Sequence, residues 1–508
     1  MRKTKIVSLL LTLLMVVTLF STACKRVEDK EDVLYIHITY AGNGYKFVED
    51  LAAKYTEIYG KEVDVTATNV GELVRTKLKA GKKNNNVDLF MAIDQMFDLV
   101  AMGKNALPGY DSIFADLSDV YNSYGYNSDV KIKDFIRAET VEYYGVNGSL
   151  YTIPYIENVM GLVYNETIFK QYGITQVPRT TDELIEVCEV LKGKIPAFTY
   201  AGKYDYWKNV YMAWWAQYEG MDNIDLFFEG KDSTGMYSVN CYKQAGRLYA
   251  LEVLEELLSP DNGYSDRNAN TYEFTEAQVY YLEGNAAMMP NGDWLENEMA
   301  ANFSEDNLNI KMMRTPIISK LGEKLGISEQ QLRDVIDYVD GVSKTKPDVS
   351  DNVIKAVEDA RIIQMGGSNA APAFIPVYSN AVDMAKDFLR LMYSPTGAEI
   401  VMRATGGVVL PVNYDYSNTE GYNDLSVFQQ SKLEITSKVN YVFESRKNPM
   451  FYAGGLTSFF VDSGCLEKNL GTNSEKDRTT AKALYQADIE YYSTRWDSIM
   501  SQAGVSND

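Results

Sequence analysis

The chain has 508 residues, of which 49 are basic and 70 acidic, and its formal net charge is −21. This length exceeds what one hydrophobic core usually organises, so we expect two or more lobes. The negative charge disfavours nucleic acid, anionic lipid heads and phosphorylated ligands as partners, unless a local cationic pocket exists. A single histidine, His37, excludes a metal site built from several histidines and leaves one residue for any histidine-based catalytic triad.

Residues 1–23 predict an export signal peptide. Basic residues precede an apolar run over 6–20, which is shorter than a membrane-spanning helix, and small residues follow it. Cys24 comes next, and this ending resembles the bacterial lipoprotein signal, except that Ser21 stands where leucine is usual. The resemblance implies acylation of Cys24, with palmitate among the chains, and a mature protein anchored at the extracellular face of the bacterial cytoplasmic membrane. A plain secretory signal and an uncleaved anchor are the alternatives.

Three further cysteines, Cys188, Cys241 and Cys465, lie far apart, and their spacing matches no disulfide framework or metal motif. Cys188 shares a helical face with apolar residues, so we expect a buried free thiol there. Paired carboxylates could act as catalysts, because 70 acidic residues always supply pairs, but no acidic motif stands out. We therefore predict no catalytic residues, no metal ligands and no cofactor.

The charged segment 24–32 predicts a flexible tether, and regular structure begins after it. Three β-rich runs alternate with helical patterns, which predicts strands at 33–40, 62–68 and 87–94 and helices at about 45–59 and 72–80. Strands alternating with helices imply parallel βαβ units and a sheet covered on both faces. Later extended runs are expected at 150–165, 286–291, 308–318, 374–379 and 408–413, and later helices at 207–219, 241–258, 272–283, 382–392 and 481–500.

Residues from about 320 to 370 differ from the rest of the chain. They contain helical patterns at 328–338 and 350–365, a polar linker near 344–347 and few strand signals. This stretch predicts an inserted helical subdomain or cap.

Four blocks of sequence resemble the extracellular solute-binding proteins of bacterial ABC importers, in the branch of maltose and oligosaccharide binders. They are VLYIHITYAGNGYKFVEDLAAKYTEIYGKEVDV, VDLFMAIDQMFDLVAMG, YTIPYIENVMGLVYNETIFKQYGITQVPRTTDEL, and YLEGNAAMMPNGDW with the later 379–411. The resemblance implies an α/β fold of two periplasmic-binding-protein-like lobes, joined by hinge crossings and carrying the added helical insertion. The N-terminal lobe would comprise 33–157 and about 315–393, and the C-terminal lobe 158–314 and about 394–508.

Ligands of open parallel sheets bind at the carboxyl ends of strands, which points to a few side chains. Asp94 ends the third predicted strand, where a carboxylate could accept hydrogen bonds from sugar hydroxyls or cap the next helix. Tyr40 and Asn43 end the first strand, beside glycines that let a ligand approach the backbone. Asn158 lies in the crossover, where the resembling maltose-type binders carry an acid, and this departure puts maltose itself in doubt.

Trp294 is the strongest candidate for ligand contact. A buried strand ends in a tight Asn-Gly turn that projects the next side chains outward, and the resembling sugar binders place a stacking aromatic here. Packing in the first turn of a helix is the alternative. Asp293 beside it could bond hydroxyls or cap that helix. Tyr204 and Trp207 lie at the mouth of another helix, whose apolar stripe belongs at least partly to the core.

The resemblance implies a monomeric, lipid-anchored binding protein, without turnover, that captures a carbohydrate and delivers it to the permease of an ABC importer. An oligosaccharide is the expected ligand. A peptide, polyamine or other solute in the same fold is one alternative. A secreted glycan-processing enzyme with paired carboxylates is another, and a surface adhesin or sensor partner is a third.

Overall fold

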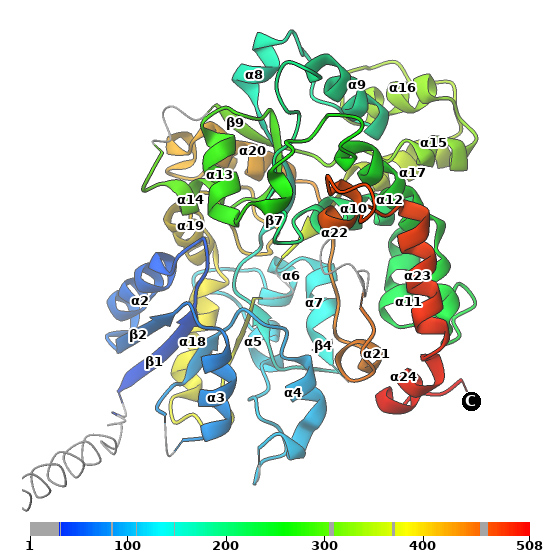
Figure 1. The fold of residues 1–508 in the computed structure, drawn as a ribbon. Coiled ribbons are helices and arrows are strands. Elements are labelled where there is room, and N and C mark those ends of the chain that lie inside the picture. The colour runs from blue at the N-terminus through cyan, green and yellow to red at the C-terminus, as the bar shows by residue number, and fades with distance from the viewer. Residues whose placement is uncertain are drawn as a thin grey trace, which may run out of the picture.

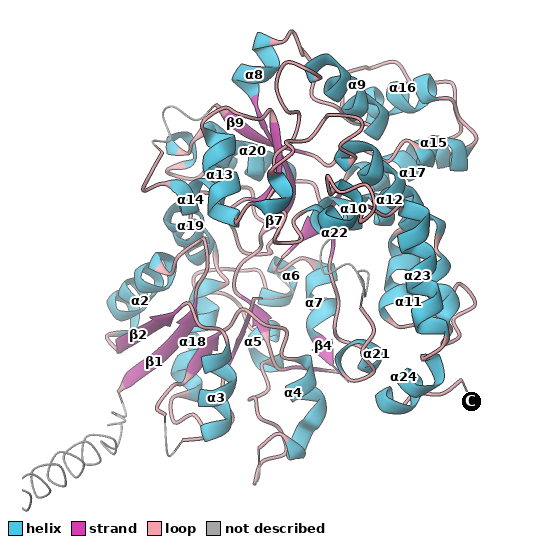
Figure 2. Ribbon diagram, in the orientation of Figure 1, coloured by secondary structure: helices cyan, strands magenta, loops and turns pink. Residues whose placement is uncertain are grey.

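The computed structural model describes residues 30, 32–82, 85–107, 109–146, 148–303, 309–367, 371–457 and 466–507. The predicted signal, Cys24 and Cys465 lie outside these residues. Within them the chain forms two α/β lobes, the first at the lower left and the second above it, with helices around each sheet (Figure 1, Figure 2). No helix of the described part is both long enough and apolar enough to cross a membrane.

The first lobe is built on a five-stranded sheet in the order β2-β1-β3-β11-β6. Its strands are β1 (Val33–Thr39), β2 (Glu62–Thr68), β3 (Leu89–Met91), β6 (Ile153–Pro154) and β11 (Pro372–Phe374). β1 pairs in parallel with β2 and β3, as the sequence predicts, while β11 runs antiparallel to β3 and β6. The core of this lobe also takes in helices α2 (Lys46–Tyr59), α18 (Val382–Met392) and α19 (Pro395–Ala404).

Local sequence explains how the first βαβ unit is formed. Apolar residues recur at helical spacing along α2, so Val48, Leu51 and Tyr55 are buried on one face of it. Gly60 ends the helix in the left-handed conformation, with φ 65°, and donates its amide to the Thr56 carbonyl. The chain then turns into β2, which leaves the β1–α2 loop at the carboxyl edge of the sheet.

The second lobe is built on a sheet in the order β12-β10-β7-β8, with β9 also paired to β7. Its strands are β7 (Val159–Asn165), β8 (Met288–Gly292), β9 (Ile310–Met313), β10 (Ile363–Gly366) and β12 (Asn440–Val442). Around it lie α9 (Thr181–Leu191), α10 (Trp207–Glu219), α12 (Ala245–Leu258), α13 (Phe274–Leu282), α14 (Leu295–Met299), α20 (Val427–Thr436) and α23 (Ala481–Ser493). Cys188 is a buried free thiol in this core, as predicted, and Cys241 is also buried and free.

The predicted insertion is helical, but it packs in the second lobe and not in the N-terminal one. Its helices are α15 (Lys320–Leu325), α16 (Glu329–Val339) and α17 (Asp351–Arg361). Leu332 and Val357 are buried in the core of the second lobe, which differs from the expected assignment of 315–393. The helix predicted at 350–365 ends at Arg361, and the residues that follow form β10 in the second sheet. A strand of four residues is too short for periodicity to reveal.

The sequence predicts that residues from about 394 onward lie in the C-terminal lobe, and here the structure differs in the opposite direction. Helix α19 packs on α2, and Val401, Val408 and Leu410 are buried in the core of the first lobe. The chain returns to the second lobe only with α20, whose Phe428 joins the core there. An amphipathic helix shows that one face is buried but not which lobe buries it, so the sequence could not decide this point.

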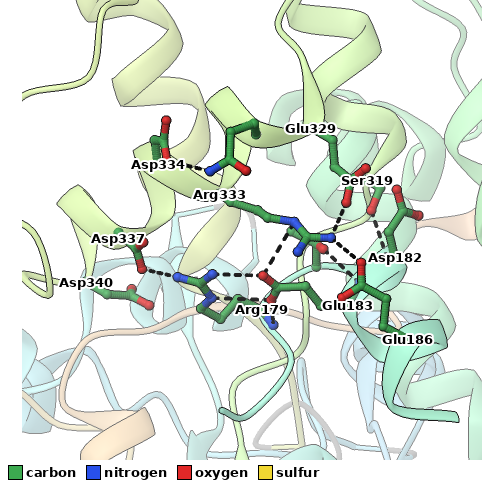
Figure 3. A network of polar contacts seen from close by, with 12 residues as sticks. Arg179, Asp182, Glu183, Glu186, Ser319, Glu329, Arg333, Asp334, Asp337 and Asp340 are labelled. Atoms are coloured by element: carbon green, nitrogen blue, oxygen red, sulfur yellow. Dashed lines mark hydrogen bonds and ion pairs between the residues drawn. The ribbon is translucent and has the colours of Figure 1, made fainter. Parts of the chain in front are cut away.

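A network of ion pairs fastens α16 to α9 (Figure 3). Arg179 donates Nη2 to Glu183 Oε1 at 2.8 Å and also pairs with Asp337 of α16. Arg333 of α16 reaches back to Glu186 Oε1 on α9 at 2.6 Å. Because the side chains of Arg179 and Glu183 are only 11% and 10% exposed, their pairing is screened less than a surface pair. The insertion is therefore held as a fixed part of the second lobe.

Three segments of the described chain connect the lobes. The first is 155–158, the second includes Gly367 after the end of β10, and the third leads into α20. Glu157 of the first segment bonds to both of the others, because its amide donates to Val409 O at 2.7 Å and its buried carboxylate accepts from the Gly367 N–H at 3.2 Å. These bonds hold the crossing segments side by side. The two sheets themselves remain separate.

A buried ion pair joins α12 to α23 within the second lobe. Arg247 Nη2 lies 2.8 Å from Asp488 Oδ2, and the two side chains are 0% and 1% exposed. The guanidinium also lies over the ring of Tyr242, 4.7 Å from its centroid, and donates to the Tyr242 carbonyl at 3.0 Å. The positive charge thus has partners on several sides, and removing its carboxylate would leave it buried and uncompensated.

We predict that Asp488→Ala lowers the free energy of unfolding by about 3–5 kcal/mol, the range for one lost partner of a buried ion pair. Chemical denaturation of both proteins measures the difference. Asp334→Ala, on the exposed face of α16, is the matched control and should change stability by less than about 0.5 kcal/mol. Equal effects of the two substitutions would contradict the role assigned to the pair.

Candidate ligand-binding cleft

A cavity of about 400 Å³ lies between the two lobes. The first lobe contributes the loops at the carboxyl ends of β1 and β3, which lie at the same edge because these strands are parallel. The second lobe contributes the start of β7, the ends of β8 and β10, and the start of α10. The side chains and backbone at the wall are Tyr40, Gly42, Asn43, Phe47, Ile93, Gln95, Tyr155, Asn158, Met160, Tyr206, Lys208, Asn209, Trp294, Glu298, Met365, Gly366, Gly367 and Glu444.

Four of the residues singled out from sequence meet at this cavity: Tyr40, Asn43, Asn158 and Trp294. They come from three separate parts of the chain and from both lobes. Asn43 Nδ2 donates to Asn158 Oδ1 at 2.8 Å, so two of them are already in contact. The fold therefore brings these four side chains together around one cavity.

Asp94 does not line the cavity. Its carboxylate accepts from Arg75 Nε at 2.6 Å, and Arg75 Nη1 binds Asp98 at 2.8 Å, so the acid is directed toward α3 (Glu72–Ala80). Nor does Asp94 cap the following helix α4 (Phe97–Met102), whose N-cap residue is Met96. Its neighbour Gln95 reaches the cavity instead. The carboxyl end of β3 does lie at the cavity, as the sequence predicts. The Asp94 carboxylate, however, is bound by an arginine of α3 and does not face the cavity.

The two candidates at the start of α10 also lie outside the cavity. Trp207 is fully buried, with its ring 5.1 Å from that of Phe198, and its backbone N–H donates to Glu467 Oε1 at 2.9 Å. Tyr204 is exposed to solvent and donates its hydroxyl to Glu273 Oε2 at 2.8 Å. Tyr206, between them, lines the cavity. The sequence predicts correctly that the start of α10 lies at the cavity. It does not predict which of the residues there face it.

Asp293 has a structural position behind the cavity. Its carboxylate Oδ2 accepts from the Val159 N–H at 3.0 Å, and its carbonyl accepts from Lys432 Nζ at 2.8 Å. It does not cap α14, for which no side-chain cap is formed. The side chain is 2% exposed, and burial raises the pKa of its carboxyl to about 6, partly offset by Lys432. Asp293 therefore ties the start of β7 to the end of β8.

Trp294 is seated directly on a glycine. A Cβ on Gly292 would lie 2.2 Å from Cζ3 of the indole, so the ring covers the α-carbon of Gly292. Gly42 of the first lobe makes a similar approach from the other side, since its Cβ would lie 2.9 Å from Cβ of Trp294 and 2.7 Å from Glu298 Oε1. Only a residue without a side chain fits at either position. The indole is thereby fixed where the lobes meet.

Sequence reasoning missed several polar residues of the wall. Asn209 is 4% exposed, and its Oδ1 has no hydrogen-bond partner among the described residues. Glu298 Oε2 accepts from Gln278 Nε2 at 2.6 Å, and burial raises the pKa of this carboxyl. Burial and the Glu298 charge raise the pKa of Tyr206 to about 12, so its hydroxyl stays protonated at neutral pH. Flat rings beside amide groups suit a ligand with apolar faces and many hydroxyls.

The comparison with protein families is decisive for the class of the protein. The sequence model of the family described as bacterial extracellular solute-binding protein matches residues 40–399 of this chain. The chain belongs to this family. Its members are binding proteins and not enzymes, and the extracellular setting of the family agrees with an export signal.

Two relatives of this solute-binding protein are named for sugars. The Multiple sugar-binding protein of Streptococcus mutans is 28% identical over 152 residues, which are 30% of this chain and 35% of that one. The Xylose/arabinose-binding protein XacG of Haloferax volcanii is 25% identical over 217 residues, which are 41% and 42% of the two chains. The matched parts span less than half of the length of either relative.

Solved structures share the fold of this solute-binding protein at low sequence identity. Maltose-bound MalE3 of T. maritima has a TM-score of 0.58 and 14% identity, covering 91% of this chain and 99% of that one. The bacterial solute receptor AcbH, described as preferring β-D-galactopyranose exclusively, has a TM-score of 0.59 and 13% identity, with 92% and 100% coverage. At such identities the likeness establishes the two-lobed fold and leaves the ligand open.

We predict that Gly292→Ala displaces the Trp294 indole, because the added methyl would overlap the ring. The free energy of unfolding should fall by about 1–3 kcal/mol, as for other overpacked sites, and the Trp294 Nε1–H resonance should move in NMR spectra. Gly71→Ala is the control, since the nearest atom lies 4.0 Å from its added Cβ. An unmoved Trp294 resonance in Gly292→Ala would contradict the described seat of the ring.

We predict that Asp293 makes stability depend on pH. Its folded pKa of about 6 lies above the unfolded value of 3.8, so its contribution is greatest below pH 3.8 and is lost as pH rises through 6. The loss reaches up to about 3 kcal/mol at 1.36 kcal/mol per unit. Denaturation from pH 4 to 7 should show that Asp293→Asn lacks this decline, and parallel profiles for the two proteins would refute the assignment.

Proposed function

We propose that this protein captures a carbohydrate in the cleft between its lobes and delivers it to the permease of an ABC importer. The observation that carries the proposal is the position of Trp294, whose ring is fixed on Gly292 at the wall of an interlobe cavity. The sugar-binding names of two relatives support the same ligand class.

The chemistry of the wall suits a sugar. The C–H face of a pyranose packs against an indole without requiring charge, and Trp294, Tyr40 and Tyr206 offer aromatic surfaces from both lobes. Amide groups, such as those of Asn158 and Asn209, can donate to and accept from ring hydroxyls. A ligand held by these side chains needs many hydroxyls.

Closure of the lobes explains how binding would be communicated. A ligand in contact with both lobes stabilises the form in which they are closed around it, and hinge crossings permit such bending. The permease can then distinguish a loaded protein from an empty one by the relative position of the lobes. Anchoring at Cys24, on a protein that acts as a monomer, would keep it near the transporter.

Two alternatives are less well supported by the wall of the cavity. A polyamine or another cationic solute would need free carboxylates, but Glu298 is bonded to Gln278 and the Glu444 carboxylate lies 3.3 Å from Arg446. A glycan-processing enzyme would need two carboxylates poised on either side of a bound sugar. Among the described residues the acidic side chains of this wall are these two, of which Glu298 accepts a hydrogen bond from Gln278 and Glu444 lies beside Arg446.

A thermal-shift and calorimetry screen of the mature protein against mono- and oligosaccharides, peptides and polyamines tests the proposal. A sugar at 100 times its Kd should add about 2.7 kcal/mol of stability. A response to peptides or polyamines alone would overturn the ligand class, and release of cleaved sugar would overturn the binding role.

For the site itself we predict that Trp294→Ala weakens sugar binding about tenfold, since lost ring stacking is worth roughly 0.5–1.5 kcal/mol beyond buried area. Tyr204→Ala is the matched aromatic control, because Tyr204 is exposed and outside the cavity. Affinity that is unchanged in Trp294→Ala, or lowered equally in both variants, would remove Trp294 from the site.

A further inference from the structure

Gln95 joins the two lobes through both polar atoms of its side-chain amide. Its Nε2 donates to the Glu444 carbonyl at 2.8 Å, while its Oε1 accepts from the Arg446 N–H at 2.9 Å and from the Tyr143 hydroxyl at 2.9 Å. The side-chain amide therefore makes the same two hydrogen bonds to residues 444 and 446 that a peptide group of a neighbouring strand would make. The donor and acceptor pattern also fixes the orientation of the amide.

The partner of Gln95 is a segment of the second lobe that reaches over to the first. We call residues 443–447 the strap; they follow β12 and lead toward α21 (Pro449–Tyr452), beside α7 (Ala138–Tyr144) in Figure 1. The ring of Phe443 lies 5.4 Å from that of Tyr143, and Lys447 Nζ donates to Glu142 O at 3.2 Å. The strap is therefore held to the first lobe at several points, of which Gln95 borders the cavity.

The lobes also touch at the other end of the cavity. There the β1–α2 loop meets α14, where Gly42 approaches Trp294 and Glu298, and Asn43 accepts from Asn297 Nδ2 at 3.4 Å. These residues follow β8, whereas the strap follows β12. In the sheet order β12-β10-β7-β8 these are the opposite edges.

The distance between the two contacts limits the space for a ligand. Three inter-strand steps of about 4.8 Å separate β12 from β8, or roughly 14 Å. Between them the wall is made by the end of β10 and the start of β7, at Gly366 and Met160. The cavity between them, about 400 Å³, falls at the small end of ligand pockets, which run from about 300 to 1,000 Å³.

We propose that the Gln95–strap contact is an end wall of the cleft that restricts the ligand to about two sugar units. This rests on the proposed carbohydrate function and narrows it to the shortest oligosaccharides. A longer chain can lie along the cleft only if the bonds from Gln95 to residues 444 and 446 break. Gln95 is thus a specificity-determining residue that acts by closing space.

Calorimetry with xylo-, cello- and malto-oligosaccharides of one to five units tests the length limit. The natural protein should bind a mono- or disaccharide at least tenfold more tightly than the matching pentasaccharide. In Gln95→Ala this ratio should fall below threefold, through gain for the long chains. Gln330→Ala, on exposed α16, should keep the natural profile. A pentasaccharide bound as tightly as the disaccharide by the natural protein, or an unchanged profile in Gln95→Ala, overturns the proposal.

Hydrogen exchange of the Arg446 amide, measured without any sugar, separates this proposal from the general function. The amide should be protected in the natural protein and in Gln330→Ala, and it should exchange at least tenfold faster in Gln95→Ala. Equal exchange in all three proteins shows that the end wall does not exist, even if sugars bind. Protection that is lost as expected, with no sugar bound by any variant, refutes the carbohydrate function and its length limit but leaves the contact established.

Discussion

The close approach of the β1–α2 loop to the start of α14 is the constraint on which the cleft depends. Gly42 comes so near to Trp294 and Glu298 that a single added carbon would not fit, and Gly292 supports the same indole from beneath. Gly42 therefore sets how closely the lobes can meet at this edge, while Gly292 sets where the ring lies within its own lobe.

Buried polar groups behind the cleft keep the crossings aligned. Glu157 links two crossing segments, Asp293 joins β7 to β8, and Lys432 of α20 donates to the carbonyls of Asp293 and Gly406. Each group is nearly without contact to water, so a broken bond would leave an unpaired charge or dipole in the interior. Such bonds favour one arrangement of the strands where the chain crosses between the lobes. Bending is then expected in the connecting residues and not within the sheets.

The sequence supported the first βαβ unit and the two-lobed architecture, because long periodic runs and four ordered blocks carry that information. It could not assign β10, since four residues hold no clear period, nor decide which lobe buries α19. In the cleft, the ends of strands were located well, and Trp294 and Asn158 do lie at the wall. Asp94 does not face the cleft because its carboxylate pairs with Arg75. The two residues are nineteen positions apart, and only the folded chain reveals their contact. Predicting that Tyr206 and not its neighbours faces the cavity would have required knowing which side of α10 faces the cleft.

The distribution of tryptophans in this chain has an optical consequence. Of the five indoles, Trp207, Trp214 and Trp215 are sealed in the core of the second lobe, and Trp496 is also buried. Trp294 alone lies at the wall of the cleft. A ligand entering the cleft would change the polarity around one emitter while the other four kept constant surroundings. The intrinsic fluorescence of the protein therefore contains a steady background and a single responsive component, which makes the unlabelled molecule its own reporter of occupancy.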